Sequence, residues 1–116
     1  MFYRRKYYIV KKEFVENFNR LFKEINLPNQ LKNGARLVGR WMLDSKGDNV
    51  EIFAIWEYDS YEDYAEIESD IRSDRDHIDH VNSWYDQHGG KLYVQQKYFV
   101  QVKNESLTST LDNSST

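Results

Sequence analysis

The chain of 116 residues contains no cysteine and a single proline. Without cysteine it has no disulfide framework, no thiolate nucleophile and no cysteine-ligated metal site. It also lacks any apolar run approaching the roughly 20 residues that a membrane-spanning helix needs, and its first strand is charged rather than signal-like. We therefore expect a cytoplasmic protein that has no membrane partner.

An excess of positive charge is missing as well. Sixteen Lys and Arg stand against nineteen Asp and Glu, which gives a formal net charge of -3. Because binding to phosphates favours a net basic surface, we expect no nucleic-acid partner. The residues that are present are 40% hydrophobic, which is enough for the core of one domain of this length.

The most informative stretch runs from Asn49 to Tyr58 and is rich in β-branched and aromatic residues, which predicts a strand. One face carries four apolar side chains: Ile52, Ala54, Trp56 and Tyr58. The opposite face carries Phe53 and Ile55. A strand that is apolar on both faces is covered on both. Helices cover one side of a small antiparallel sheet, so the other side is expected to meet a second subunit.

Before this strand, aromatic and β-branched residues predict a first strand over Phe2–Val10. A helix is predicted next, because apolar residues recur with a helical period: Phe14, Val15, Phe18, Leu21, Phe22 and Ile25. Since the residue before a proline avoids helical geometry, the helix is expected to end at Leu27-Pro28. A second strand is predicted over Ala35–Leu43, with Arg36 and Arg40 on one face.

After the central strand, Ser60 predicts the start of a second helix that breaks near Ser73-Asp74 and then resumes. Gly89-Gly90 stops it, and a last strand is predicted over Lys91–Val102. The order β-α-β-β-α-β predicts an α+β, ferredoxin-like fold with an antiparallel sheet and helices on one face. The domain is expected to span residues 1–103. The Ser/Thr-rich tail, residues 104–116, is expected to be disordered.

Several short motifs resemble the NIPSNAP family, within the superfamily of dimeric α+β barrels. The first strand carries Phe2-Tyr3 and Lys6-x-Tyr8, and the second carries Leu37-Val38-Gly39-x-Trp41. The densest motif is Trp56-x-Tyr58-Asp59-Ser60-Tyr61-Glu62. The resemblance implies a ferredoxin-like homodimer whose sheets face each other. It implies no particular activity, because the family has no single established one.

Six residues form a candidate ligand pocket beneath the sheet: Arg40, Trp56, Tyr58, His77, His80 and Trp84. Arginine can clamp a carboxylate through two hydrogen bonds. The interpretation preferred for the strand arginines is that they pair with Glu51 or Glu57 across the hairpin, or lie exposed to solvent at an edge. His77 and His80 share a helix face, yet no second cluster supplies further metal ligands, so no metal is expected. Trp41 and Trp56 are expected to pack in the core.

The preferred function is a homodimeric NIPSNAP-like protein that binds a small molecule or acts as an accessory protein, without a cofactor. The alternative is an oxygenase of the antibiotic-biosynthesis monooxygenase type, either cofactor-independent or haem-degrading. A third interpretation is a pure interaction module. The resemblance implies that an oxygenase of this superfamily would use a His on the second helix, a Trp on the third strand and an Asn on the first. Here His77 or His80 and Trp56 fit, but the first strand has no Asn.

We predict that the protein does not turn over haem. A haem-degrading pocket needs a proximal histidine and a polar group that fixes bound oxygen, and neither Lys6 nor Tyr8 replaces an amide that both donates and accepts. Titration with haemin is expected to give no sharp Soret shift that saturates at one haem per subunit. A saturating shift that His77→Ala or His80→Ala abolishes would favour the oxygenase instead.

Overall fold

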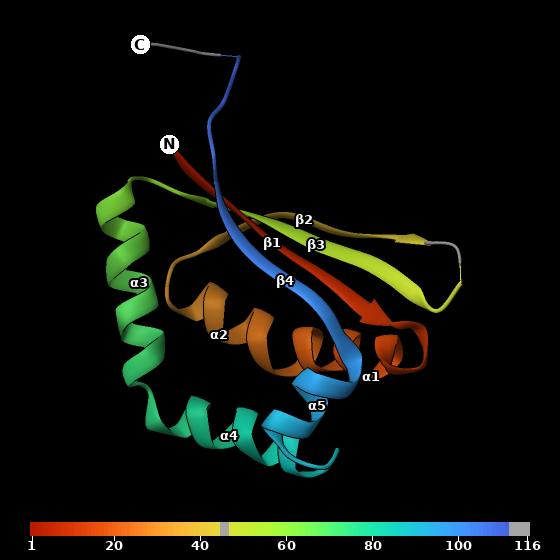
Figure 1. The fold of residues 1–116 in the computed structure, drawn as a ribbon. Helices are drawn as coiled ribbons and strands as arrows, with labels where there is room; N and C mark the ends of the chain where they lie inside the picture. The colour runs from red at the N-terminus through yellow and green to blue at the C-terminus, as the bar shows by residue number, and fades with distance from the viewer. Residues whose placement is uncertain (45–46, 112–116) are drawn as a thin grey trace.

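The computed structural model describes residues 1–44 and 47–111, with no account of the Asp44 side chain. A four-stranded antiparallel sheet lies above a layer of helices (Figure 1). The strands are β1 (Phe2–Lys11), β2 (Arg36–Asp44), β3 (Asn49–Tyr58) and β4 (Phe99–Leu107). The helices are α1 (Val15–Leu21), α2 (Leu27–Lys32), α3 (Tyr61–Ser73), α4 (Arg75–Asp86) and α5 (Lys91–Tyr98).

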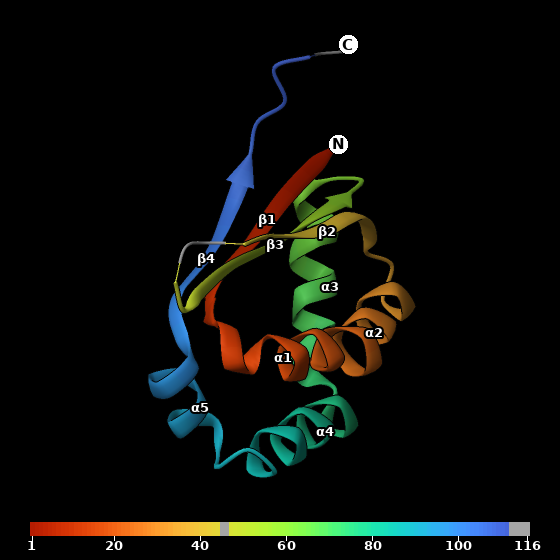
Figure 2. The ribbon, with the colours of Figure 1, turned by 90° about the vertical axis from the view of Figure 1, so that its right-hand side faces the viewer.

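The strands lie in the order β2-β3-β1-β4, and each neighbouring pair is antiparallel. Both crossover connections pass on the same side, so the helices lie below the sheet and its upper face is bare (Figure 2). This is the ferredoxin-like arrangement, and the predicted fold class is confirmed. The extra helix α5 lies below β4, at the edge of the sheet opposite β2.

The predicted alternation along β3 is confirmed. Its buried and half-buried residues alternate without exception, and the buried set includes Trp56 and Tyr58, each 1% exposed. Residues paired across an antiparallel ladder share a face. The strand pairing therefore places Phe53, Ile55, Tyr7 and Trp41 together on the bare face.

Two clusters of buried residues fill the space between the sheet and the helices. The larger joins β1 and β3 to α1, α4 and α5: Val10, Phe14, Phe18, Leu21, Val50, Ile52, Trp84, Tyr85 and Val94. The smaller lies under the other end of β3: Ala35, Ala54, Trp56 and Tyr58. The stripe predicted for the first helix is confirmed, since three of its residues belong to the larger cluster.

The helical segment after β1 is longer than predicted. Lys12–Phe14 forms a 3-10 turn before α1, and Phe22–Asn26 forms a π turn before α2. Leu27 donates its backbone N–H to the Phe22 carbonyl, five residues back, and Pro28 occupies the first turn of α2. The predicted stop at Leu27-Pro28 is therefore wrong. In a π turn the missing proline N–H and the bulk of its ring are accommodated, so the helix continues to Lys32.

Strand β2 contains a bulge beside Gly39 that the alternating pattern did not predict. Leu37 pairs with Trp56 and Gly39 pairs with Ile55, which leaves Val38 as an extra residue. A bulge of one residue exchanges the faces of everything beyond it. The prediction that Arg36 and Arg40 share a face is therefore wrong: Arg36 lies on the bare face and Arg40 faces the helices.

The same bulge changes the position of the first predicted core tryptophan. Trp41 lies on the bare face, 47% exposed, and covers Gly39, where a Cβ atom would lie 2.4 Å from the indole ring. The expectation that Trp41 packs in the core of the subunit is wrong, whereas Trp56 is buried as expected.

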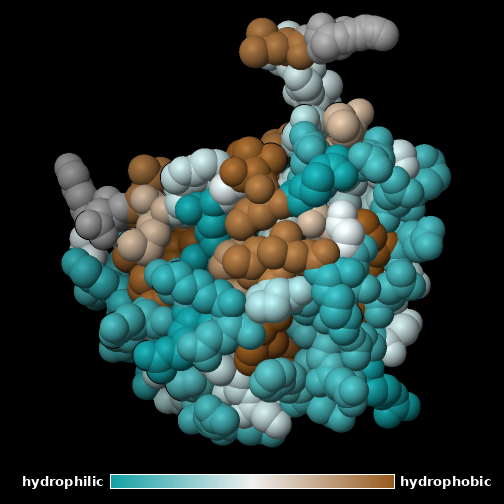
Figure 3. All heavy atoms as spheres, turned by 180° about the vertical axis from the view of Figure 1, so that it is seen from behind, coloured by the Kyte–Doolittle hydropathy of each residue, from teal (hydrophilic) through white to brown (hydrophobic). Residues whose placement is uncertain are grey.

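Seen from behind, hydrophobic side chains gather over the middle of the molecule (Figure 3). On that side β2 forms the sheet edge, and its exposed apolar residues include Val38, Met42 and Leu43.

The predicted break in the second helical region is confirmed, and side chains cap both of its parts. The Ser60 side chain accepts a hydrogen bond from the Asp63 N–H at 3.1 Å, which starts α3. Asp74 ends α3 and starts α4, because its side chain accepts from the His77 N–H at 3.1 Å. These caps satisfy helix-terminal N–H groups that would otherwise lack partners.

The last predicted strand is wrong in its first two thirds. Gly90, with φ at 100°, precedes α5, in which Val94 is fully buried. The strand itself is β4, which pairs with β1 as far as Leu107. The ordered domain thus passes the expected boundary at residue 103 by four residues. The disorder predicted for the tail stays a prediction beyond Leu107, and residues 112–116 lie outside the described part of the chain.

The burial of Trp56 generates a stability test. Replacing it with alanine deletes a ring that packs 6.1 Å from that of Phe22, and such core truncations cost ~3–5 kcal/mol. We expect Trp56→Ala to lower the free energy of unfolding by this amount in urea denaturation. Leu92→Ala, at a residue 68% exposed on α5, is the matched control and should cost under about 0.5 kcal/mol. Equal losses for the two variants would contradict the assigned core.

Candidate functional site

A cavity of about 230 Å³ lies between the helix-facing side of the sheet and the helices. The strands contribute five residues to its wall: Lys6, Tyr8, Arg40, Ala54 and Trp56. The helical segments contribute Phe18, Phe22, Gln30, Glu68, Ile71 and His77. Asn26 completes the wall. Residues far apart in the sequence therefore meet around one space that combines aromatic surface with charged and polar groups.

Arg40 is the least compensated of the charged residues on this wall. Its Nη1 donates to the Asn19 Oδ1 at 2.7 Å, while its Nη2 is buried and has no hydrogen-bond partner among the described residues. The guanidinium lies over the Phe22 ring, 4.3 Å from the ring centroid. Burial without a carboxylate lowers the pKa of Arg40 to about 10, because desolvation disfavours the charged form.

The second cation of the wall is paired. The Lys6 Nζ lies 3.4 Å from the Glu68 Oε1, and the two side chains are only 20% and 14% exposed. A pair with this degree of burial is less screened by solvent than a surface pair. Lys6 comes from β1 and Glu68 from α3, so the pair ties the second helical region to the middle of the sheet.

Other polar groups of the wall are shielded from solvent. The Gln30 Oε1 is buried without a hydrogen-bond partner among the described residues. Burial raises the pKa of the Tyr8 hydroxyl and lowers that of the His77 imidazole. His77 is therefore favoured in its neutral form at pH 7, when it can accept as well as donate a hydrogen bond.

The structure brings together three of the six predicted pocket residues. Arg40, Trp56 and His77 line the cavity, whereas Tyr58, His80 and Trp84 do not. Tyr58 packs beyond Trp56, with its ring 5.0 Å from that of Tyr64. Its buried hydroxyl has no partner in the described chain, and burial raises its pKa.

The other two predicted residues lie below the cavity. His80 is exposed in a shallow groove that it shares with Asp74 and Asp76. Trp84 belongs to the larger core cluster, with its ring 5.7 Å from that of Phe14. Among the described residues, no group of three or more His, Asp or Glu side chains converges as metal ligands would. The assignment of a ligand site to these six residues stays a prediction.

The prediction missed Glu68 and Gln30 as residues of the cavity wall. Glu68 lies four residues after Tyr64 and three before Ile71, so it shares a helix face with two apolar side chains. A carboxylate on the apolar face of a helix could have indicated a polar residue at a buried site. Gln30 gave no such signal, because the expected helix ended before it.

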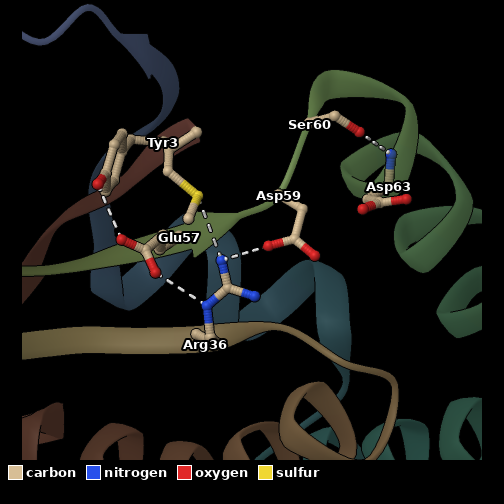
Figure 4. Close-up of polar contacts among 7 residues, drawn as sticks. Tyr3, Arg36, Glu57, Asp59, Ser60 and Asp63 are labelled. Atoms are coloured by element: carbon tan, nitrogen blue, oxygen red, sulfur yellow. Dashed lines mark hydrogen bonds and ion pairs between the residues drawn. The ribbon is translucent and has the colours of Figure 1, made fainter. Parts of the chain in front are cut away.

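Arg36 forms the pairing with a glutamate across the hairpin that the sequence analysis considered for the strand arginines. It pairs with Glu57 across the hairpin at 2.8 Å and with Asp59 at 2.9 Å (Figure 4). The Tyr3 hydroxyl donates to the other Glu57 oxygen at 2.8 Å. The Arg36 and Tyr3 hydrogen bonds lower the pKa of Glu57. This cluster holds the rim of the bare face together, and its arginine, unlike Arg40, has carboxylate partners.

The fold and the cavity together define an α+β, ferredoxin-like domain with a partly polar space beneath its sheet. The NIPSNAP family model matches residues 3–101. The chain therefore belongs to the NIPSNAP family, which confirms the resemblance seen in the motifs. Comparison with curated proteins found no match.

Solved structures of similar fold include other NIPSNAP proteins. A NIPSNAP family protein from Agrobacterium tumefaciens is 16% identical, with a TM-score of 0.71 over 94% of this chain and 92% of that one. An uncharacterised NIPSNAP domain protein from Burkholderia xenovorans is 20% identical, with a TM-score of 0.66 over 95% of both chains. A dimeric ferredoxin-like protein from an uncultured marine organism is 16% identical, with a TM-score of 0.50 over 96% and 97%.

These likenesses bear on the fold, and neither they nor the family match supports the oxygenase alternative. Within the described ranges, no helix is both long and apolar enough to cross a membrane. The cytoplasmic location and the lack of a nucleic-acid partner stay predictions.

Proposed function

We propose that this NIPSNAP protein binds a small molecule in the cavity beneath its sheet. The observation that carries the proposal is the pair of buried polar atoms on the cavity residues Arg40 and Gln30 that lack partners in the described chain. Buried polar groups in folded proteins are nearly always hydrogen-bonded, because an unmet group loses its hydration without compensation. A polar ligand in the cavity would supply the missing partners.

The composition of the wall supports the same function. Ligand sites are concave and mostly apolar, with a few polar groups that fix orientation. Here Trp56, Phe18 and Phe22 supply aromatic surface, and Arg40 with Gln30 supplies polarity. The ion pair of Lys6 with Glu68 adds charged groups to one part of the wall.

A cavity-filling variant tests this proposal. Ala54 lies on the cavity wall and is 4% exposed, so Ala54→Leu extends a larger side chain toward the cavity. We expect native mass spectrometry to detect a small molecule on the wild-type protein, or on protein soaked with indole, and not on Ala54→Leu. Ala65→Leu, at a half-buried site on α3, is the control and should bind as wild type does. The absence of any bound molecule from the wild type, or equal binding to Ala54→Leu, would contradict a ligand site here.

We also propose that the protein is a homodimer joined through the bare face of the sheet. This face carries Phe53 and Ile55 on β3 with Trp41 and Leu43 on β2, and the Trp41 and Phe53 rings lie 5.6 Å apart. Contiguous exposed apolar surface of this kind marks an interface. The similar protein from a marine organism is described as dimeric, which supports the same assembly. A stable interface would bury roughly 1,600 Å² in total.

The dimer is tested by placing a charge in the centre of this face. Phe53→Glu leaves the helix-facing core untouched, because Phe53 lies on the opposite face, and Arg5, 5.7 Å from its ring, is already paired with Glu105 at 2.8 Å. Light scattering is expected to give twice the 14.0 kDa chain mass for the wild type and a single chain mass for Phe53→Glu.

The control Leu92→Glu changes a residue 68% exposed on α5 and should remain dimeric. A wild type that stays a single chain at all concentrations would contradict the assembly. A dimeric Phe53→Glu would contradict this interface.

A further inference from the structure

The charges on the cavity wall do not cancel. Among the cavity residues of the described chain, Lys6 and Arg40 are permanent cations and Glu68 is the only acidic residue. Glu68 lies within ion-pair distance of Lys6, and no described carboxylate lies within that distance of Arg40. With His77 neutral, the wall therefore carries an excess of one positive charge.

The surroundings of Arg40 make this charge costly to bury. A cation in a poorly solvated site needs a counter-charge or a full set of hydrogen bonds, and Arg40 has neither. Its contacts on the ring faces of Phe18, at 5.4 Å, and Phe22, at 4.3 Å, stabilise a cation only modestly. The exposed counterpart on the same strand, Arg36, has two carboxylate partners.

An arginine fork presents parallel N–H donors whose geometry matches the two oxygens of a carboxylate. In Arg40 one terminal nitrogen already donates to Asn19, and the other is the buried unpaired atom. An acceptor at that nitrogen would satisfy the buried donor and supply the missing charge in one contact. Trp56 and Ile71 on the same wall offer apolar surface to the rest of a molecule.

We propose that the cavity takes a small organic monoanion, with its carboxylate on Arg40 and its apolar or aromatic body against Trp56 and Phe22. This assignment rests on the proposed function, since it names the ligand class of the same site. A single charge matches the excess of one, whereas a phosphate dianion would overcompensate it. A neutral molecule of equal shape would leave the guanidinium without a counter-charge.

A matched pair of probes separates charge from shape. Phenylacetate and phenylacetamide have nearly the same size, and only the first carries a charge at pH 7. We expect calorimetric titration of the wild type to give a Kd for phenylacetate that is ~10- to 100-fold lower than that for phenylacetamide. Charge-assisted hydrogen bonds are roughly twice as strong as neutral ones, and each 1.4 kcal/mol gained is about tenfold in Kd. Indole serves as a third, uncharged probe for access to the cavity.

Two substitutions assign the preference to Arg40. Arg40→Met keeps much of the side-chain length and should remove the preference for the acid, so that phenylacetate and phenylacetamide bind with Kd values within about two-fold of each other. Arg40→Lys keeps the charge but not the fork, so an intermediate preference is expected. Arg36→Met, on the bare face, is the matched control and should change neither Kd. Near-UV circular dichroism checks that each variant is folded. If Arg40→Met does not fold, Arg40→Lys still carries the test.

The outcomes distinguish the ligand class from the site itself. Equal binding of the two probes, or binding of indole alone, would overturn the monoanion and leave small-molecule binding intact. A preference for phenylacetate that persists in both Arg40 variants would overturn the role of this arginine. Failure of all three probes to bind the wild type, together with no retained molecule, would overturn the proposed function along with the inference.

Discussion

Strand β3 has hydrophobic side chains on both of its faces, and the helices are arranged to keep water from one of them. Its two edges are satisfied by ladders to β1 and β2, which makes it an inner strand. On one face the helices cover Ile52, Ala54, Trp56 and Tyr58. On the other face no helix is available, since both crossovers pass below the sheet. The sheet of a second subunit has the same uncovered apolar face, and two such faces can pack against each other.

One extra residue in β2 decides the chemistry below the sheet. Without the bulge at Val38, Arg40 would lie on the same face as Arg36, beside acidic residues and solvent. The bulge turns its guanidinium toward the helices, where Asn19 is its only side-chain hydrogen-bond partner in the described chain. Bulges are common next to functional sites for this reason, since they re-aim a side chain without breaking the sheet.

The cavity also shows how stability and function can oppose each other in one small core. Trp56 belongs to the buried cluster that holds β3 to the helices and at the same time forms part of the cavity wall. Unpaired polar atoms beside it cost free energy that a purely apolar wall would not. Proteins retain such local conflicts where a site requires them, and this is the reason for the binding site proposed above.

What the sequence by itself determined was the set of features that depend on neighbours along the chain. The two-sided apolar pattern of β3, the helical stripe from Phe14, the cap at Ser60 and the break near Asp74 all follow from local sequence. From these came the order of elements and hence the fold. The NIPSNAP motifs added the family.

Only the tertiary structure decided the features whose local signals were ambiguous or absent. Val94 and Tyr98 are four residues apart, which fits one face of a strand and one face of a helix equally well, so packing selected α5. The bulge at Val38 lies next to Gly39, and a glycine inside a strand is compatible with a bulge but does not specify one, so the register was decided by pairing with β3. Lys6 and Glu68 are 62 residues apart and meet only because β1 and α3 pack together. The candidate site depends on such long-range contacts, which the local periodicity of the sequence does not predict.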